Sequence, residues 1–523
     1  MTRPAFALVL ALAACTAHPR PGQASPARRL AEGPGQALLA SPAGGAAVYL
    51  RNPIHPRGPL LPPDAFLGEL TLIDAYGTPH PLGPGATNLA GAVLFSPDGR
   101  FVAFLHDFDF SSHQGLLAIA DAEGNVHPMG SGVTFFGFSP DGHLLGYIAG
   151  GALSLVPLAG AGKPISLGSG VATFEFSSDS RAILFRRGAA GGELVLATVD
   201  GRASPIVVAR GAADYRFDAK GQAIAYTLET PDRLPELHLW KGGAQRLLGT
   251  AATSFEFSPD GRTLAYVAGV RADYLEGDVF VAPVAGGAPR LVGRHAGAYR
   301  FSADGRLAFL HDYYDQSRSG RLAVWSPGGE PIEVASSVSL FGWSHQGAYL
   351  AWLHAVSRPM YTEQLFLAQA ERPSIARFVG EAIYAFDFSP DDRELLFKTR
   401  CISGGTACDL MEVPTAAPAA PAAERDGGPS PEKATRVAAG VQDYDFSPDQ
   451  RWLWLAFMEP VGHIVDLALI PAKGWSLPRY FAHAAEPHPR WLPDGRIAFL
   501  VNGPKHAGFY EVRPLDVPAA LAR

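Results

Sequence analysis

Short runs of alternating apolar and polar residues, separated by turns, extend along most of the chain. Residues 255–257 (Phe-Glu-Phe) alternate before a turn at 258–261, and apolar residues recur after it at 264–267. Period two on both sides of a tight turn predicts a β-hairpin. Most units continue with a third run, as at 278–281, and a weaker fourth run, as at 290–292. No apolar run of helical period and length stands out, so the pattern predicts an all-β protein.

The turn belongs to a short sequence motif that recurs along the chain. It reads FSPDGR at 95 and 257, FSPDGH at 138 and FSADGR at 301, with looser copies at 176, 217, 343, 388, 446 and 491. Ser, Pro, Asp and Gly in this order suit a type I turn, because Pro sets φ, Ser and Asp bond the local backbone, and Gly accepts positive φ. All intervals but one lie between 38 and 45 residues. This is the size of one four-stranded propeller blade.

A degenerate first unit precedes these ten copies, so the sequence predicts about eleven blades. That unit starts near Leu38 and carries residues 68–72 as its outer strand. A longer duplication is also visible. SGVTFFGFSPDG from Ser131 matches SSVSLFGWSHQG from Ser336, and AFLHDFDF from Ala103 matches AFLHDYYD from Ala308, both at an offset of 205. Five units therefore appear twice.

The duplication leaves two arrangements open. Tandem propellers of about five blades (37–255) and six blades (256–523) fit the duplicated units, and each would have a usual blade number. A chain of 523 residues is also long for one ordinary core. We therefore expect two rings. The alternative is one large or open ring of all eleven blades.

The chain opens with a targeting segment. Residues 5–14 form an apolar run behind a basic residue, which is too short to span a bilayer and typical of a signal peptide. Residues 12–15 (Leu-Ala-Ala-Cys) resemble the lipobox of bacterial lipoproteins, in which the signal, here 1–14, is cut before a lipidated Cys15. This implies an exported protein held by lipid in the cell envelope, at the outer membrane and facing the periplasm or the surface. A plain secretory signal is the alternative.

Two segments are predicted to be flexible. Residues 15–36 are rich in Pro, Gly, Ala and Arg without periodicity, and we interpret them as a tether between anchor and folded body. Residues 414–434 are a Pro/Ala-rich stretch of low complexity, and we interpret them as a disordered insertion. No other segment is long and apolar enough to suggest a membrane span, so the lipid would be the only membrane contact.

The chain has three cysteines. If Cys15 carries lipid, Cys401 and Cys408 are the two that can pair with each other. They flank residues 402–407, the connection between two strands of one blade. In an exported protein this arrangement predicts a disulfide that clamps the hairpin. A metal or redox pair is the alternative, although the spacing is wide for a redox motif.

The charge balance limits the choice of partners. The formal net charge is −7, and no stripe of Lys and Arg is present to neutralise phosphates, so we expect no nucleic-acid partner.

The repeated FSPDGR followed by a strand such as TLAYV resembles the TolB-like, WD-repeat-like β-propellers of bacterial exported proteins. The resemblance covers about residues 38–517 and implies a propeller fold. It implies almost nothing about activity, because the motif builds the scaffold. A partner-binding domain like the one at the N-terminus of TolB is not evident. Similar blades form the gating domain of prolyl oligopeptidases.

Nothing in the sequence predicts catalysis or a cofactor. No G-x-S-x-G elbow is present, and the glycines at 130–132 and 168–170 lack its spacing. Residues 160–163 (Gly-Ala-Gly-Lys) are followed by Pro164, so a phosphate loop is rejected. His483, Glu486 and His488 could ligate a metal, but prolines interrupt their spacing, and we interpret them as a solvated turn.

The candidate binding residues lie in loops between the second and third strands, which should share one face of the ring. Aromatic and charged residues on rigidly held loops are typical of binding surfaces. The candidates are His106, Asp107 and Phe108, their duplicates His311, Asp312 and Tyr313, and Tyr274, His354 and Tyr361 at the corresponding place in other units. The alternative is structural: the Asp caps a strand end, the His bonds a neighbouring blade, and duplication copied both.

The sequence thus favours a non-catalytic envelope lipoprotein that acts as a binding or assembly scaffold for protein or cell-wall-associated partners. A ligand-binding or hydrolytic propeller with a site in the central channel is the alternative. Convergence of three or more acidic or His side chains at the axis would favour that alternative. A purely structural surface protein is a third possibility.

Overall fold

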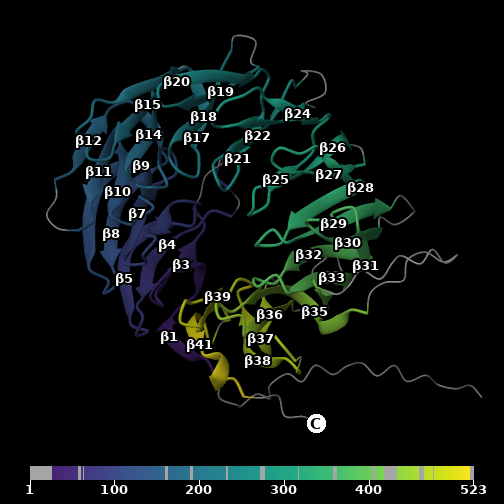
Figure 1. The fold of residues 1–523 in the computed structure, drawn as a ribbon. Coiled ribbons are helices and arrows are strands. Elements are labelled where there is room, and N and C mark those ends of the chain that lie inside the picture. Colours follow the sequence, from purple (N-terminus) through teal and green to yellow (C-terminus); the bar gives the residue numbers. More distant parts are fainter. Residues whose placement is uncertain are drawn as a thin grey trace, which may run out of the picture.

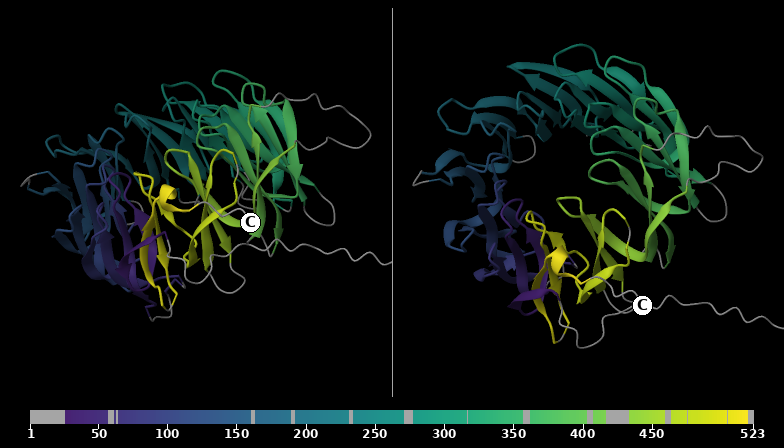
Figure 2. Two further views of the ribbon diagram at one scale, coloured as in Figure 1. Left: turned by 90° about the horizontal axis from the view of Figure 1, so that it is seen from below. Right: turned by 60° about the horizontal axis from the view of Figure 1, so that its bottom comes forward.

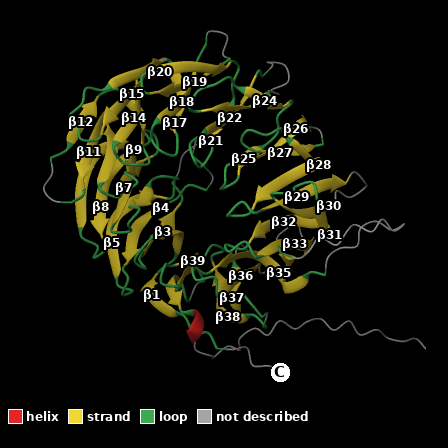
Figure 3. Ribbon diagram, viewed as in Figure 1, coloured by secondary structure: helices red, strands yellow, loops and turns green. Residues whose placement is uncertain are grey.

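The computed structural model describes residues 26–518 apart from several internal segments, and the described chain is almost entirely β (Figure 3). The segments outside the described residues are 57–60, 63, 160–162, 189–191, 231–233, 271–276, 316, 357–361, 403–406, 417–432, 459–463, 475 and 504. The described residues form strands β1–β41 and one short 3-10 helix, η2 (Pro514–Asp516). Among them, no helix is long and apolar enough to cross a membrane.

The strands form antiparallel blades of four strands each, and in blades 1 to 10 the chain runs from the inner to the outer strand (Figure 1). Blade 1 contains β2 (Gly35–Ala40), β3 (Ala47–Ile54), β4 (Leu67–Ile73) and β5 (Pro79–Thr87). Blade 2 contains β6 (Val93–Phe95), β7 (Phe101–Asp109), β8 (Gln114–Asp121) and the start of β9 (Val126–Phe138). Blade 3 contains the rest of β9, β10 (Leu144–Ala149), β11 (Ala152–Pro157) and β12 (Ile165–Gly168).

The next three blades are regular four-stranded sheets. Blade 4 contains β13 (Val171–Phe176), β14 (Ala182–Arg187), β15 (Glu193–Thr198) and β16 (Ile206–Arg210). Blade 5 contains β17 (Ala212–Phe217), β18 (Ala223–Leu228), β19 (Glu236–Lys241) and β20 (Ala244–Gly249). Blade 6 contains β21 (Ser254–Phe257), β22 (Thr263–Ala268), β23 (Asp278–Pro283) and β24 (Arg290–Gly293).

Long strands connect the blades that follow. Blade 7 contains β25 (Tyr299–Phe301), β26 (Leu307–Tyr314), β27 (Ser319–Trp325) and the start of β28 (Ile332–Trp343). Blade 8 contains the rest of β28, β29 (Tyr349–Val356), β30 (Thr362–Gln369) and β31 (Ala376–Glu381). Blade 9 contains β32 (Ile383–Phe388), β33 (Glu394–Ile402), β34 (Ala407–Pro414) and the start of β35 (Thr435–Phe446).

The last two blades complete the predicted number of eleven repeats. Blade 10 contains the rest of β35, β36 (Trp452–Met458), β37 (Val465–Pro471) and β38 (Arg479–Ala485). Blade 11 contains β39 (Arg490–Trp491), β40 (Ile497–Val501), β41 (Gly508–Val512) and, as its outer strand, β1 (Arg28–Glu32). The prediction of an all-β propeller fold built from four-stranded repeats is confirmed.

The recurring motif forms the turn between the first two strands of a blade. In blade 6 the Ser258 hydroxyl donates to Asp260 Oδ1 at 2.6 Å and accepts from the backbone N–H of Thr263 at 3.0 Å. The Gly261 N–H donates to the Ser258 carbonyl at 2.8 Å, and Gly261 has φ +68°. Asp98, Asp141, Asp179, Asp304, Asp391 and Asp449 accept from the serine of their own turns in the same way. The repeat is therefore a local hydrogen-bonded unit, as its residue types predict.

The N-terminal strand closes the ring. β1 pairs antiparallel with β41, with Arg28 opposite Glu511 and Glu32 opposite Gly508. The prediction of a flexible tether over 15–36 is therefore wrong for residues 28–36, which contain β1 and the start of β2, whereas residues 15–25 lie outside the described residues. The hydrogen-bond partners of β1 lie almost the whole chain length away, so no local pattern marks this strand. Figure 2 shows the purple and yellow ends of the chain side by side.

Eleven hydrophobic clusters hold the blades together, and each contains buried residues of two consecutive blades. One cluster joins Leu237 of blade 5 to Tyr266 of blade 6. Another cluster joins the first blade to the last one, with the aromatic ring centroids of Tyr49 in blade 1 and Phe509 in blade 11 lying 5.3 Å apart. Of the two arrangements that the sequence left open, this packing is that of one ring (Figure 1).

The boundary expected at 255/256 does not separate two cores. The cluster between blades 5 and 6 extends across it, and Arg246 of blade 5 donates to the Pro283 carbonyl of blade 6 at 2.7 Å. The repeats pack through the same residue types whichever blade follows, so the sequence pattern carries no signal for ring size.

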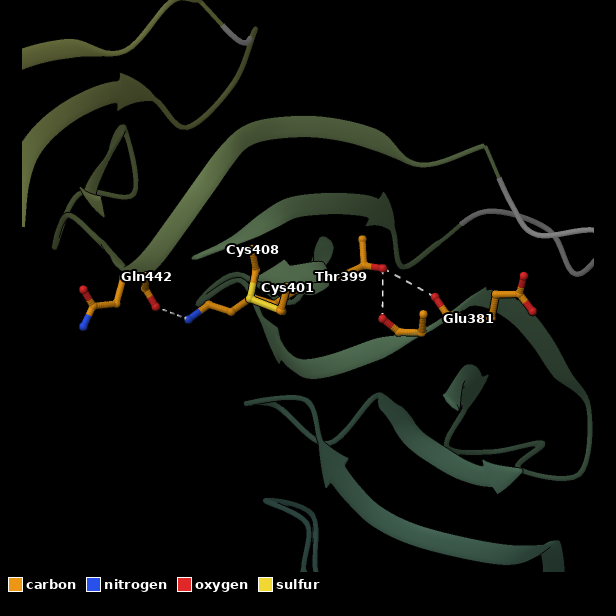
Figure 4. The surroundings of a disulfide bond; sticks show 7 residues. Glu381, Thr399, Cys401, Cys408 and Gln442 are labelled. Carbon is orange, nitrogen blue, oxygen red and sulfur yellow. Dashed lines mark hydrogen bonds between the residues drawn. A yellow bond between two sulfur atoms is a disulfide. The ribbon is translucent and has the colours of Figure 1, made fainter. Parts of the chain in front are cut away.

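The predicted disulfide is confirmed. Cys401 and Cys408 are bonded across β33 and β34, beside the opposed pair Ile402 and Ala407 (Figure 4). Of the predicted insertion 414–434, residues 417–432 lie outside the described residues. Thr415 before them is buried, and its hydroxyl donates to the Asp392 carbonyl at 2.6 Å.

Candidate functional site at the inner wall of the ring

The duplicated His-Asp pairs mark a bulge in the second strand of two blades. The pairing register shifts between His106 and Asp109 in β7, and between His311 and Tyr314 in β26. Asp107 has φ +47° and Asp312 has φ +46°, a left-handed conformation that Asp adopts more readily than most residues. The recurrence of Asp at this position therefore has a backbone cause.

The surroundings of the two pairs differ. The His-Asp contact itself recurs, with His106 Nδ1 3.1 Å from Asp107 Oδ2 and His311 Nδ1 3.4 Å from Asp312 Oδ2. His311 has a second partner, because its Nε2 lies 2.6 Å from Glu333 Oε1. Arg321 Nε donates to Glu333 Oε2 at 3.1 Å. At the offset of 205, the counterparts of Arg321 and Glu333 are Leu116 and Pro128. Duplication thus preserved the bulge and not the charged network, and the two pairs lie apart, in blades 2 and 7.

The prediction that the candidates lie in loops is wrong for the described ones, since Phe108, Tyr313 and His354 belong to the second strands β7, β26 and β29. These three residues have separate surroundings. Phe108 contacts Phe110 edge to face, with centroids 5.1 Å apart. Tyr313 packs against the core between blades 7 and 8. His354 Nδ1 lies 2.8 Å from the Ser336 carbonyl oxygen. Tyr274, Tyr361 and the proposed lipidation site Cys15 lie outside the described residues.

Two adjoining cavities lie beside the inner strands of blades 11, 1, 2 and 3. The first cavity has a volume of about 520 Å³, and Leu39, Leu94 and Arg490 are among its lining residues. The second cavity has a volume of about 580 Å³, and Phe108, Phe135 and His113 are among its lining residues. Both volumes lie within the range of small-molecule sites. Of the candidate residues that the structure describes, Phe108 lines the second of these two cavities.

The two cavities share one wall. Leu89, Ala90, Gly91 and Leu94 line both of them. Phe95, Phe136 and Phe138 make the second cavity strongly aromatic, while Glu486 and His488 join Arg490 on the polar side of the first. The pair therefore offers a continuous apolar surface with one charged end.

One position of each inner strand, two residues before the turn, distinguishes this part of the ring. We call it the inner-wall position. In blades 1 to 11 its residues are Leu39, Leu94, Gly137, Glu175, Arg216, Glu256, Arg300, Gly342, Asp387, Asp445 and Arg490. Blades 1–3 carry two leucines and a glycine there, and the cavities lie at those blades. Of the other eight blades, seven carry a charge.

The charges pair between consecutive blades. Burial raises the pKa of Glu175, and the neighbouring Arg216 lowers it again. Burial likewise raises the pKa of Glu256, opposed by Arg300. For Asp445, burial and then the Asp443 carboxylate raise the pKa, while the Phe446 N–H and Arg490 lower it. Glu175, Glu256 and Asp445 thus each have an arginine of the next blade as a compensating charge. Asp387 differs, because the next blade carries Asp445 at this position; burial raises the pKa of Asp387, and the Phe388 N–H and then His345 lower it.

Hydrogen bonds between inner strands rigidify the charged part of the wall. The Tyr215 hydroxyl lies 2.7 Å from Thr173 Oγ1, and the Tyr299 hydroxyl donates to Ser254 Oγ at 2.9 Å. Trp343 Nε1 donates to the Arg300 carbonyl at 3.1 Å. These bonds join blades 4 to 5, 6 to 7 and 7 to 8.

Acidic side chains gather on the inner strands of blades 9 and 10. Burial raises the pKa of Tyr444 far above its usual value, and Asp387, Asp443 and Asp445 add to this effect. Burial also raises the pKa of Asp387. These acidic groups lie on two adjacent inner strands, whereas the sequence interpretation connects a central ligand site with convergence at the axis of the ring, which stays a prediction. Within the described residues, no group of His, Cys, Asp and Glu is arranged to hold a metal ion.

The three residues considered as metal ligands have separate partners. His483 Nδ1 lies 2.8 Å from Asp466 Oδ1. Asn502 Nδ2 donates to Glu486 Oε1 at 2.5 Å, and His488 Nδ1 lies 4.0 Å from Asp443 Oδ2. Glu486 and His488 line the first cavity, a role that sequence reasoning missed. Aligning the repeats in the sequence would have identified the residues at the inner-wall position. The cavities could not be found in this way, because they depend on how blades 11, 1, 2 and 3 pack together.

Comparison with known proteins finds distant structural likenesses and no match in sequence. No protein-family model matches the chain, and no characterised protein matches its sequence. A crystal structure of a eukaryotic initiation factor aligns with a TM-score of 0.42 and 13% identity, over 80% of this chain and 96% of that one. A crystal structure of the tricorn protease aligns with a TM-score of 0.27 and 14% identity, over 90% of this chain and 46% of that one. The chain thus spans about half the length of that protease. Such distant likenesses carry no conclusion about activity.

Proposed function

We propose that this chain is a non-catalytic, TolB-like envelope lipoprotein whose ring is a scaffold for a protein or cell-wall-associated partner. Residues 1–14 would direct export, and lipid on Cys15 would hold the ring at the outer membrane, facing the periplasm or the surface. The resemblance of residues 12–15 to a lipobox supports this placement. The Cys401–Cys408 disulfide is compatible with an oxidising compartment.

The apolar inner wall of blades 1–3 is the observation that carries the proposal. Phe135 is 41% exposed and Leu39 is 38% exposed, beside two cavities that share Leu94. The inner-wall position is charged in most other blades, so the apolar part is confined to one sector. A confined, exposed apolar surface next to cavities is typical of a binding site.

Site-specific photo-crosslinking in the bacterial envelope tests this proposal. A photoreactive residue at Phe135 would probe the inner wall. The same residue at Ile206, on the outer strand β16, is the matched control, because Ile206 is 51% exposed. The proposal predicts a reproducible protein or peptidoglycan adduct from position 135 and not from position 206. No adduct from position 135, or the same adducts from both positions, would contradict it.

The anchor has a separate test. Cys15→Ser should abolish incorporation of a labelled fatty acid and release the protein from the membrane fraction. Undiminished labelling of this variant would remove the lipoprotein part of the proposal.

A ligand-binding or hydrolytic propeller is the second candidate. The gathering of Asp387, Asp443 and Asp445 around Tyr444 favours it, as do the two cavities. Its site would lie at the inner strands of the ring.

A further inference from the structure

Arg490 gives the two adjoining cavities one cationic end. It lies on the inner strand β39 at the inner-wall position of blade 11, is exposed, and lines the first cavity. Among the described residues, no carboxylate forms a salt bridge with its guanidinium; Asp445 acts on it at longer range. The guanidinium can therefore donate to an incoming group in the cavity.

The acidic neighbours of Arg490 accept hydrogen bonds from other groups or lie nearer to them, and Asp445 interacts with Arg490 through its charge alone. Glu486, which lines the same cavity, accepts from Asn502 Nδ2 at 2.5 Å. Asp445 accepts from the Phe446 N–H at 2.8 Å. Asp443 lies 4.0 Å from His488, which is also at the cavity. An anion at this end would therefore meet Arg490 and His488 as its donors, beside the Glu486 carboxylate.

Most of the remaining surface is apolar, although Gln36, Thr87 and Asn88 line the first cavity and His113 and Thr134 line the second. Leu39 and Leu94 line the first cavity, and the shared residue Leu94 connects it with the aromatic second cavity, where Phe135 is exposed. A ligand that reaches from Arg490 toward Phe135 therefore passes from a cationic end to an apolar one. Complementarity of charge and polarity then specifies an amphipathic anion.

We propose that the two cavities together bind a small amphipathic organic anion, with its acidic group at Arg490 and its apolar or aromatic body against Leu39, Leu94 and Phe135. This goes beyond the scaffold role and is independent of it, because a partner protein could bind the inner wall with the cavities empty. Crosslinking from Phe135 can thus fail while this inference holds, and the reverse is also possible.

Binding of two matched fluorescent probes tests the inference. Anilinonaphthalene sulfonate carries an aromatic body and one anionic group, and phenylnaphthylamine is its neutral parent. On the wild-type protein the sulfonate is expected to bind more tightly. Arg490→Gln should weaken sulfonate binding about tenfold, the factor for one lost charge-assisted hydrogen bond, and leave binding of the neutral probe unchanged.

Arg216→Gln is the matched control. Arg216 occupies the inner-wall position of blade 5, is exposed as Arg490 is, and does not line either cavity. Its loss should leave binding of both probes unchanged. Leu94→Trp, at the shared wall, should abolish binding of both probes, with urea unfolding to show that the ring is intact.

Three results would overturn the inference. The first is equal weakening by Arg490→Gln and Arg216→Gln, which would mean a general charge effect of the wall. The second is equal affinity for the sulfonate and its neutral parent. The third is unchanged binding to a folded Leu94→Trp protein, which would place the probe outside the cavities.

Discussion

Arg496 in blade 11 donates from Nη2 to the backbone oxygen of Gly45 in blade 1, at 3.0 Å. Its side chain is only 7% exposed, and it also donates to the Ala75 carbonyl at 3.2 Å, to Asp494 and to Glu511. One buried guanidinium thus joins the last blade to the first. Together with the pairing of β1 and β41, it closes the ring.

Loss of this guanidinium should destabilise the ring strongly. Arg496→Met is expected to lower the free energy of unfolding by about 3 kcal/mol, because it leaves a buried carboxylate and carbonyl groups without their donor. Arg262→Met is the control, since Arg262 holds the same place in the turn of blade 6 with its side chain 79% exposed. Its effect should stay within about 0.5 kcal/mol. Urea unfolding measures both, and equal effects would argue against a special role of Arg496.

Removal of β1 should open the ring. A chain that begins after residue 32 lacks the outer strand of blade 11 and leaves the edge of β41 unpaired. Its thermal unfolding midpoint should fall, and light scattering should show self-association, because an open edge can pair with another chain. A chain that begins at residue 26 retains β1 and should behave as the full chain. Identical midpoints for the two truncations would contradict closure by β1.

Acidification should act in opposite directions on two residues of one hairpin. The Ser258 hydroxyl holds the pKa of Asp260 below its usual value. A lowered folded pKa adds stability above the unfolded pKa, about 3.9, and this stability is lost as pH falls through the folded pKa. Burial raises the pKa of Glu256, so its ionisation costs stability as pH rises above about 4.3.

Two substitutions separate these effects. Asp260→Asn should lower stability at neutral pH, and Glu256→Gln should raise it, with both differences shrinking toward zero below about pH 4. Chemical unfolding at a series of pH values measures them. A shift of the same sign for both variants at neutral pH would refute the assigned pKa directions.

The disulfide should contribute modestly to stability. Replacing both Cys401 and Cys408 by Ala removes a bond that closes a short loop, with a sequence separation of 7. The expected loss is less than about 3 kcal/mol on the chain-entropy model, with the fold retained. Reductant should bring the wild-type chain from residue 26 onward to the level of the variant and leave the variant unchanged. A variant that fails to fold would show that the bond does more than close this loop.

The blade number was predictable because each turn is a local unit. The bonds of Ser258 with Asp260 and Thr263 lie within six consecutive residues, so the sequence carries them directly. The disulfide was predictable for the same reason. Ring closure was not, because β1 is five residues without alternation whose partners lie in β41.

The candidate site was only partly predictable. The His-Asp pairs stood out by repetition, yet Asp107 and Asp312 recur because a bulge needs a residue that tolerates positive φ. Leu39 and Leu94 are unremarkable in sequence and become distinctive only when the inner-wall position is compared across all blades. The first cavity is lined by residues of β2, β6 and β39, which belong to three different blades. The residue spacing within one repeat does not predict that these strands lie next to each other.

Crosslinking across the ring closure tests the central claim, one ring closed by its own N-terminal strand. Arg28 and Glu511 are opposed in β1 and β41, and Cα atoms of opposed strand residues lie within disulfide reach. Under mild oxidation, the pair Arg28→Cys and Glu511→Cys should form an intrachain disulfide, and Arg28→Cys with Glu236→Cys of blade 5 should not. A bond from position 28 to blade 5, with none to position 511, would contradict the single ring.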